Sequence, residues 1–184
     1  THVQPDEVAL MVASGAVAGL CPTTEANLGD GLFPLAEFIA AGGRFGVGSD
    51  SHVSQSPVEE LRWLEYGQRL QRQQRNVAAT PDERHVGDYL WQTALQGGAQ
   101  AAGRKLGALA PGCRADLLVL DDAHVNLCGV AIADVLGSVL FCGNDNLVRD
   151  VLCGGQWQVR DGRHVAQDAI ATAYKRTLAQ LRAL

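Results

Sequence analysis

Asp50 and His52 are the residues of this chain that are best placed for chemistry. They lie in the segment 46–52, directly after a short apolar stretch, 43–48, that is typical of a buried strand. A helix is predicted to begin after Ser56, which puts Asp50 in a strand-to-helix loop. In an α/β barrel, catalytic residues lie at this end of the strands. A carboxylate there can bind a divalent cation with one oxygen and move a proton with the other, which is the chemistry of metal-assisted hydrolysis.

The same positions also suit structural roles. An aspartate that precedes a helix can accept hydrogen bonds from its first backbone N–H groups, so Asp50 could simply cap the following helix or turn. His52 could contact a substrate or a metal, or it could be a polar residue at the rim of the site. His2 also precedes a predicted helix at this rim, whereas His85, His124 and His164 are predicted to be structural or solvated.

A second polar segment, 21–31, follows another predicted strand. Its sequence, Cys-Pro-Thr-Thr-Glu-Ala-Asn-Leu-Gly-Asp-Gly, ends in a glycine-flanked turn. We predict a long loop that lines a pocket, with Glu25 as a candidate substrate contact; an ordinary connection rich in turn-forming residues is the alternative. The chain contains no phosphate-binding loop, GxGxxG, GxSxG or HExxH motif, which removes the common nucleotide-binding, serine-hydrolase and zincin interpretations.

Helices and strands alternate around these two segments. Helices are predicted at 6–14 and 34–41 and strands at 16–21 and 44–48, an order that implies a parallel sheet. Ser56, Pro57 and Glu59 form the pattern of a capping box, from which a helix runs to about Gln71. Two further helices are predicted at 83–95 and 98–104.

The pattern changes near residue 106. A strand is predicted at 115–121, and the apolar stretch 130–141 favours a helix at its start. Strands at 147–152 and 156–159 flank a glycine turn, and Asp161-Gly162 predicts a second hairpin turn. From Gln167 onward, apolar residues recur at spacings of three and four, which indicates an amphipathic helix.

Composition narrows the class of protein. The chain has 184 residues, 47% of them hydrophobic, and a net charge of −5. It is long enough for a sizeable core. The scattered basic residues argue against a nucleic-acid surface, and no segment has the length of a membrane span or the character of a signal peptide, so we expect a cytoplasmic protein that acts on a small molecule.

The five cysteines do not suggest disulfides or a structural zinc site. They are odd in number, widely spaced and free of any CxxC pair, and most stand among apolar residues. We therefore predict that they are small buried side chains.

Three segments together resemble the amidohydrolase superfamily. They are 46–52 (Gly-Val-Gly-Ser-Asp-Ser-His), 21–31 and 106–121 (Leu-Gly-Ala-Leu-Ala-Pro-Gly-Cys-Arg-Ala-Asp-Leu-Leu-Val-Leu-Asp). Within the superfamily the chain looks most like the N-formimino-L-glutamate deiminases of histidine degradation. The resemblance implies an α/β fold: the C-terminal portion of a (β/α)8 TIM barrel at 1–105, with strands seven and eight, a segment of a small β-sandwich at 106–164 and a C-terminal helix at 165–184.

The resemblance also implies a mononuclear zinc site. Its family ligands are an HxH pair on strand one, a histidine on strand five and an aspartate on strand eight, which corresponds to Asp50. Asp50 is thus the expected metal ligand and proton acceptor, and His52 and Glu25 are expected substrate contacts. His2 corresponds to a histidine that is not catalytic. The other ligands and most contacts to an acidic small-molecule substrate are expected in an N-terminal half that precedes this chain.

Two alternatives stay open. The chain could belong to another deaminase of the superfamily that acts on a cyclic amidine such as guanine. It could instead be a non-catalytic fragment or partner module, because this fragment alone lacks the other metal ligands. Family members are commonly dimeric, so the resemblance further implies a homodimer, with no nucleic-acid or membrane partner.

Overall fold

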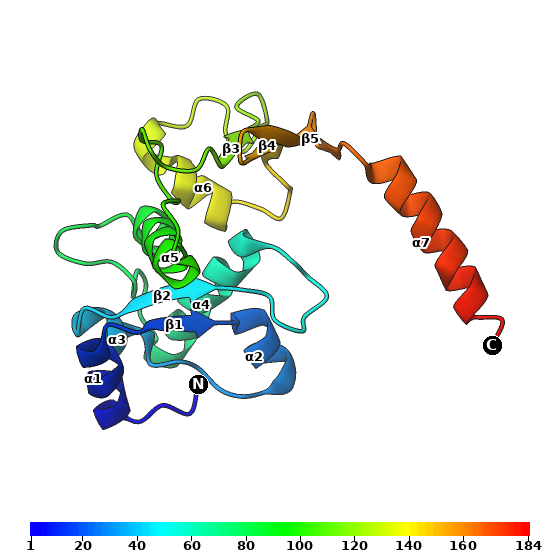
Figure 1. Ribbon diagram of the computed structural model, residues 1–184. Coiled ribbons are helices and arrows are strands. Elements are labelled where there is room, and N and C mark those ends of the chain that lie inside the picture. Colours follow the sequence, from blue (N-terminus) through cyan, green and yellow to red (C-terminus); the bar gives the residue numbers. More distant parts are fainter. The chain divides into compact units, whose positions relative to one another are not determined.

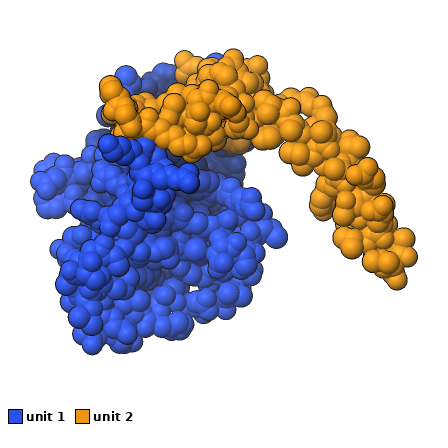
Figure 2. All heavy atoms as spheres, in the orientation of Figure 1, with its two compact units in different colours: residues 1–107, 123–145 blue, residues 108–122, 146–184 orange.

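The computed structural model describes residues 1–184 and divides into two compact units (Figures 1 and 2). The first unit comprises residues 1–107 and 123–145, and the second comprises 108–122 and 146–184. The segment 123–145, which the sequence analysis assigned to the second domain, lies in the first unit. The domain boundaries proposed from the sequence stay predictions. None of the helices combines the length and the apolar character that crossing a membrane requires.

The first unit is an α/β structure around two parallel strands. Strand β1 pairs with β2 in the register Val17 to Arg44 and Leu20 to Val47, which confirms the predicted parallel pairing. Its elements are α1 (Pro5–Ser14), β1 (Val17–Leu20), α2 (Pro22–Leu28), α3 (Leu35–Ala40), β2 (Arg44–Val47), α4 (Pro57–Arg72), α5 (Val86–Ala102), η1 (Ile132–Asp134) and α6 (Val135–Phe141).

Two predictions about helices were wrong. The segment 21–31 is not one long loop, because Pro22–Leu28 forms helix α2. Pro22 fits the first turn, where its missing N–H costs nothing, and Gly29 ends the helix in a left-handed conformation. The helices predicted at 83–95 and 98–104 are one continuous helix, α5.

Gly97 explains why α5 continues through two glycines. A Cβ atom at Gly97 would overlap the backbone carbonyl of Phe45 in β2, so the helix can lie this close to the strand only because residue 97 has no side chain. Gly98 has open space on its Cβ side. Gly97 is therefore the point where the helix lies against the strand, and neither glycine breaks the helix.

Helix α4 holds the unit together through buried polar side chains. Ser56 accepts a hydrogen bond from the N–H of Glu59 (3.3 Å) and caps the helix as predicted. Further along, the buried carboxylate of Glu65 accepts from the N–H groups of Val77 (3.0 Å) and Ala78 (2.9 Å). The side-chain amide of Gln68 donates to the carbonyl of Phe33 (2.9 Å). Segments that precede and follow α4 in the sequence are thus fixed to it.

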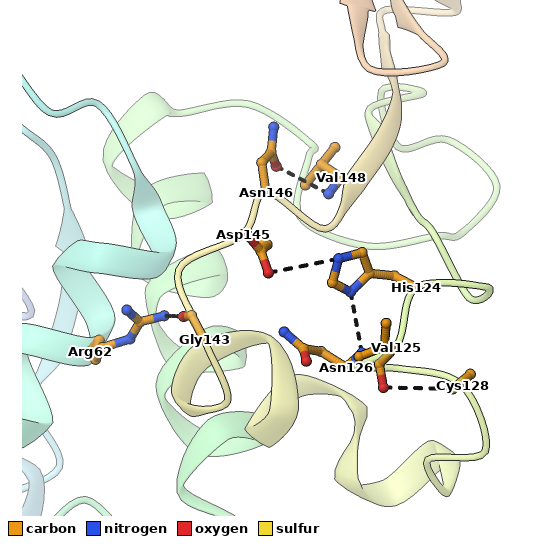
Figure 3. Close-up of polar contacts among 9 residues, drawn as sticks. All are labelled: Arg62, His124, Val125, Asn126, Cys128, Gly143, Asp145, Asn146 and Val148. Atoms are coloured by element: carbon orange, nitrogen blue, oxygen red, sulfur yellow. Dashed lines mark hydrogen bonds and ion pairs between the residues drawn. The ribbon is translucent and has the colours of Figure 1, made fainter.

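Arg62 of α4 explains why the segment 123–145 belongs to the first unit (Figure 3). Its guanidinium donates to the carbonyls of Leu140 and Gly143 and to the side chain of Asn144. Leu140 lies in the last turn of α6, and Gly143 and Asn144 follow its end, where backbone carbonyls lack helical partners. His124 and Asp145 lie 3.8 Å apart between Nε2 and Oδ2 in the same region (Figure 3).

The second unit is a four-stranded antiparallel sheet in the order β3-β4-β5-β6, followed by a helix. Its elements are β3 (Leu117–Leu120), β4 (Val148–Cys153), β5 (Gln156–Arg160), β6 (Arg163–His164) and α7 (Gln167–Leu181). Asp161 and Gly162 both have positive φ, 48° and 73°, as the predicted Asp-Gly turn requires. Helix α7 forms where expected, but none of its residues is buried.

Asp150 fixes the turn of this sheet. The side chain is only 4% exposed, and its carboxylate accepts from the N–H of Asp161 (2.9 Å) and the guanidinium of Arg149 (3.0 Å). The hydrogen bond from Asp161 is the main reason that the pKa of Asp150 is lowered, and Arg149 adds to the effect. The negative charge of Asp150 is therefore part of the folded hairpin.

The expectation of buried cysteines was wrong. All five are free thiols, but Cys128, Cys142 and Cys153 are exposed and Cys21 and Cys113 are partly exposed. Buried leucines stand shortly before three of them (Leu20, Leu127 and Leu140), whereas the cysteines themselves lie in turns, at helix ends or at a strand end. Local hydrophobicity did not reveal which way each side chain points.

Replacement of Gly97 by alanine should destabilise the folded chain. The added methyl group would collide with the Phe45 carbonyl, and such overpacking typically costs about 1–3 kcal/mol. Gly98→Ala is the matched control, since it meets no atom and gains up to about 1 kcal/mol of helix propensity. Denaturant unfolding followed by circular dichroism checks both variants, and equal stability of the two would contradict the close contact.

Candidate active site

The carboxyl ends of β1 and β2 bring the two polar segments of the sequence together. The parallel pairing continues beyond the strands, because the N–H of Gly48 donates to the carbonyl of Leu20 (3.0 Å). Cys21 therefore follows β1 at the same edge where Ser49 and Asp50 follow β2. In open and closed α/β sheets, this edge is where ligands bind.

Asp50 lies in a tight turn at this edge. The N–H of His52 donates to the carbonyl of Ser49 (2.9 Å), which closes the turn around Asp50 and Ser51. Asp50 has a φ of 47°, in the left-handed region that few residues other than glycine adopt. Its carboxylate is exposed and makes no hydrogen bond or ion pair. The capping alternative was wrong, because Ser56 and not Asp50 caps α4.

The pKa of the Cys21 thiol reflects the closeness of the segments 21–31 and 46–52. Burial is the main cause that raises the pKa of this thiol above its ordinary value. The carboxylates of Asp50, Glu25 and Glu60 raise it further, in that order. Acidic groups from the β2–α4 turn, from α2 and from α4 thus converge on Cys21, which stays protonated at neutral pH.

Two threonines of α2 connect this helix to the rest of the site. The hydroxyl of Thr24 donates to the carbonyl of Ser49 (2.8 Å), the residue directly before Asp50. Thr23 donates to Glu60 of α4 twice, from its N–H (3.0 Å) and from its hydroxyl (2.5 Å). Helix α2 is therefore attached both to the turn that carries Asp50 and to the helix that follows this turn.

The other candidate residues have defined local partners. Glu25 accepts a hydrogen bond from the N–H of Cys21 (3.0 Å), so its carboxylate stabilises the start of α2. His52 accepts from the N–H of Ser54 through Nδ1 (3.0 Å). In the neutral imidazole the proton is then on Nε2, which is left as a donor. His2 is exposed near the start of α1. Contact of Glu25 or His52 with a substrate stays a prediction.

The residues of this chain do not form a complete metal site. No group of three or more histidine, cysteine, aspartate or glutamate side chains is arranged to hold a metal ion. Catalytic zinc sites have three protein ligands and an open position. The exposed carboxylate of Asp50 fits one such ligand, so a metal here needs further ligands from outside this chain.

Sequence reasoning missed Thr23, Thr24 and Glu60. Polar residues on the apolar face of α4 were the available signal, because Glu65 and Gln68 follow Leu61 and Leu64 at spacings of four. Glu60 is likewise buried next to Leu61. A buried carboxylate needs hydrogen-bond donors, which shows that some segment must supply them but does not identify α2 as that segment.

Comparisons with known proteins agree with this geometry. The sequence profile of the amidohydrolase family matches residues 1–158 of this chain. The chain is 55% identical to the formimidoylglutamate deiminase of Pseudomonas aeruginosa, over 98% of this chain and 40% of that protein. It is 32% identical to the 8-oxoguanine deaminase of the same organism, over 88% of this chain and 34% of that protein.

Solved structures give the same result. The crystal structure of an amidohydrolase from Brucella melitensis matches with a TM-score of 0.89 and 42% identity, over 98% of this chain and 40% of that chain. An adenosine deaminase from Xanthomonas campestris with bound zinc shares the fold, with a TM-score of 0.83 and 19% identity over 100% of this chain and 42% of that chain. The chain thus spans about two fifths of the length of these relatives, and it belongs to the amidohydrolase family.

Proposed function

We propose that this chain is part of a zinc-dependent hydrolase that converts N-formimino-L-glutamate and water into N-formyl-L-glutamate and ammonia. The observation that carries the proposal is the exposed carboxylate of Asp50, held on a turn beyond the carboxyl ends of two parallel strands. The 55% identity to a formimidoylglutamate deiminase supports this substrate. The fold that this chain shares also holds zinc in the adenosine deaminase from Xanthomonas campestris, which supports zinc as the metal.

We propose the architecture that the resemblance to the amidohydrolase superfamily implies. Strands β1 and β2 would be strands seven and eight of a (β/α)8 barrel, and the β3–β6 sheet would be part of a small β-sandwich. The remaining metal ligands and the cationic groups for the acidic substrate would come from the part of the relatives that this chain does not cover. A homodimer in the cytoplasm stays a prediction from the resemblance.

Asp50 has two roles in this reaction. One carboxylate oxygen would be a ligand of the divalent cation, which supplies Lewis acidity for activating the attacking water when it is bound. The other carboxylate oxygen accepts a proton from that water while the water oxygen attacks the formimino carbon. Asp50 passes this proton to the formimino nitrogen and then transfers the proton of the newly added hydroxyl group to the same nitrogen, so that the carbon–nitrogen bond breaks and ammonia departs as the formyl carbonyl forms. Because the carboxylate makes no other hydrogen bond, both oxygens are available.

A second candidate is a deaminase that acts on a cyclic amidine related to guanine. The 32% identity to 8-oxoguanine deaminase favours it. The chemistry of Asp50 would be the same, since water again displaces ammonia at a carbon bonded to two nitrogens. The two candidates differ in the contacts that bind the remainder of the substrate.

Asp50→Asn in the complete enzyme should lower kcat by at least about 100-fold, because an amide keeps the shape but cannot accept the proton. Ammonia release from N-formimino-L-glutamate is the assay, and circular dichroism verifies the fold. Asp82→Asn, which removes an exposed carboxylate from the loop between α4 and α5, should leave turnover unchanged. Activity of the Asp50 variant near that of the wild type would refute its role.

Removal of the metal should abolish turnover without unfolding the enzyme. Dialysis of the complete enzyme against a chelator, followed by elemental analysis, should give a metal-free and inactive protein, and added Zn²⁺ should restore both metal and activity. The reason is that water at neutral pH is a poor nucleophile unless a cation lowers its pKa. Full activity of a protein shown to contain no metal would exclude the proposed mechanism.

The substrate can be decided by direct comparison. Ammonia release should be fast with N-formimino-L-glutamate and at least about 100-fold slower, as kcat/KM, with 8-oxoguanine and guanine. A site whose polar groups match one substrate leaves those groups unpaired with the other. A preference for 8-oxoguanine or guanine would instead establish the second candidate.

A further inference from the structure

Thr24 contacts the peptide that carries Asp50, although the proposed reaction assigns it no role. We propose that Thr24 is a positioning residue for Asp50: its hydroxyl fixes the turn 49–52 and thereby the direction of the Asp50 carboxylate. The effect on catalysis rests on the proposed function. The effect on the turn does not, because it follows from contacts within this chain.

The carbonyl of Ser49 is the point at which the turn is held. It accepts two hydrogen bonds, one from the N–H of His52 (2.9 Å) and one from the hydroxyl of Thr24 (2.8 Å). The first closes the turn on itself, while the second attaches it to α2. Thr24 is only 4% exposed, so water cannot readily replace its hydroxyl.

The anchor on α2 is itself fixed. Thr23 donates its N–H and its hydroxyl to the two carboxylate oxygens of Glu60, which is 1% exposed. Glu60 belongs to α4, the helix into which the Asp50 loop leads. The turn is therefore held by Thr24 at its beginning, while Glu60 holds α2 and α4 in a fixed relation.

Asp50 depends on this support because it has little of its own. Its backbone is in the left-handed region, with a φ of 47°, which aspartate tolerates better than most residues but which still depends on support from its surroundings. Its carboxylate makes no hydrogen bond or ion pair that would orient it. The backbone of the turn therefore sets the position and direction of the Cα–Cβ bond of Asp50, and loss of the Thr24 hydroxyl should let both vary.

The test compares four forms of the complete, zinc-loaded enzyme. Thr24→Val removes the hydroxyl at nearly constant volume, and Thr24→Ser keeps it. The control is Thr172→Val, which removes a threonine-to-carbonyl bond of the same length, 2.8 Å, that is exposed and lies within α7, to Asp168. Each form is assayed for kcat and KM with N-formimino-L-glutamate, and hydrogen–deuterium exchange is measured in peptides that cover 49–53.

Thr24→Val should lower kcat by about 10- to 100-fold, the order expected for a misplaced catalytic group, with KM within about threefold of the wild type. Exchange in 49–53 should become faster. Thr24→Ser should restore both properties, and Thr172→Val should change neither. A merely stabilising role would shift the melting temperature of Thr24→Val but would not change kcat in the folded enzyme.

Several results would overturn the positioning role. These are a kcat of Thr24→Val within about threefold of the wild type, Thr24→Ser as slow as Thr24→Val, or unchanged exchange in 49–53. If Thr24→Val does not fold, Thr24→Ala removes the same hydroxyl without placing a methyl group there, and the same criteria apply. A wild-type enzyme that does not act on N-formimino-L-glutamate refutes the proposed function, and the exchange in 49–53 then decides the role of Thr24 alone.

Discussion

The buried carboxylate of Glu60 is the contact on which the geometry of the site depends. It is 1% exposed, and both of its oxygens accept hydrogen bonds from Thr23 of α2. A buried carboxylate that lost these donors would be strongly unfavourable, so α2 and α4 are obliged to stay together. Since Thr24 follows directly and donates to Ser49, the same contact also fixes the turn that carries Asp50.

The strand beneath this turn is fixed by a second constraint of a different kind. Gly97 lets the backbone of α5 lie directly on Phe45 of β2, where a side chain would collide with the strand. On its other edge β2 pairs with β1 in parallel, which places Cys21 beside the Asp50 turn. Backbone packing and strand pairing position the carboxyl ends of β1 and β2. Side-chain hydrogen bonds then fix the turn that follows β2.

The site shows how one chain can present an exposed carboxylate without forming a complete metal site. Asp50 is exposed, in a left-handed turn, and unpartnered, which suits a side chain that must face a cation and a water molecule. The chain has no cluster of metal-ligating side chains and spans about two fifths of its relatives. In the proposed enzyme this part would support one metal ligand, while α4 anchors the surrounding loops through Glu65 and Gln68.

Local patterns in the sequence predicted much of the fold correctly. The alternation of helix and strand gave the parallel pair β1–β2, Ser56 and Pro57 gave the start of α4, and Asp161-Gly162 gave the hairpin turn. The errors occurred where context decides. Proline and paired glycines often interrupt helices. Pro22 nevertheless begins α2, because the first turn of a helix tolerates proline. Gly97 and Gly98 lie within α5, because the closeness of β2 requires glycine at position 97.

For the site, the sequence by itself determined that an aspartate follows an apolar strand and precedes a capped helix. These features depend on residue types and short spacings, which involve only residues close together in the sequence. Only the tertiary structure decided that Ser56 leaves Asp50 free of a capping role. It also brought Thr24 to Ser49, 25 residues further along the chain, and Thr23 to Glu60, 37 residues further along, and these contacts hold the turn of Asp50. Hydrogen bonds between distant segments depend on how helices and strands pack, and no local pattern encodes which donor meets which acceptor.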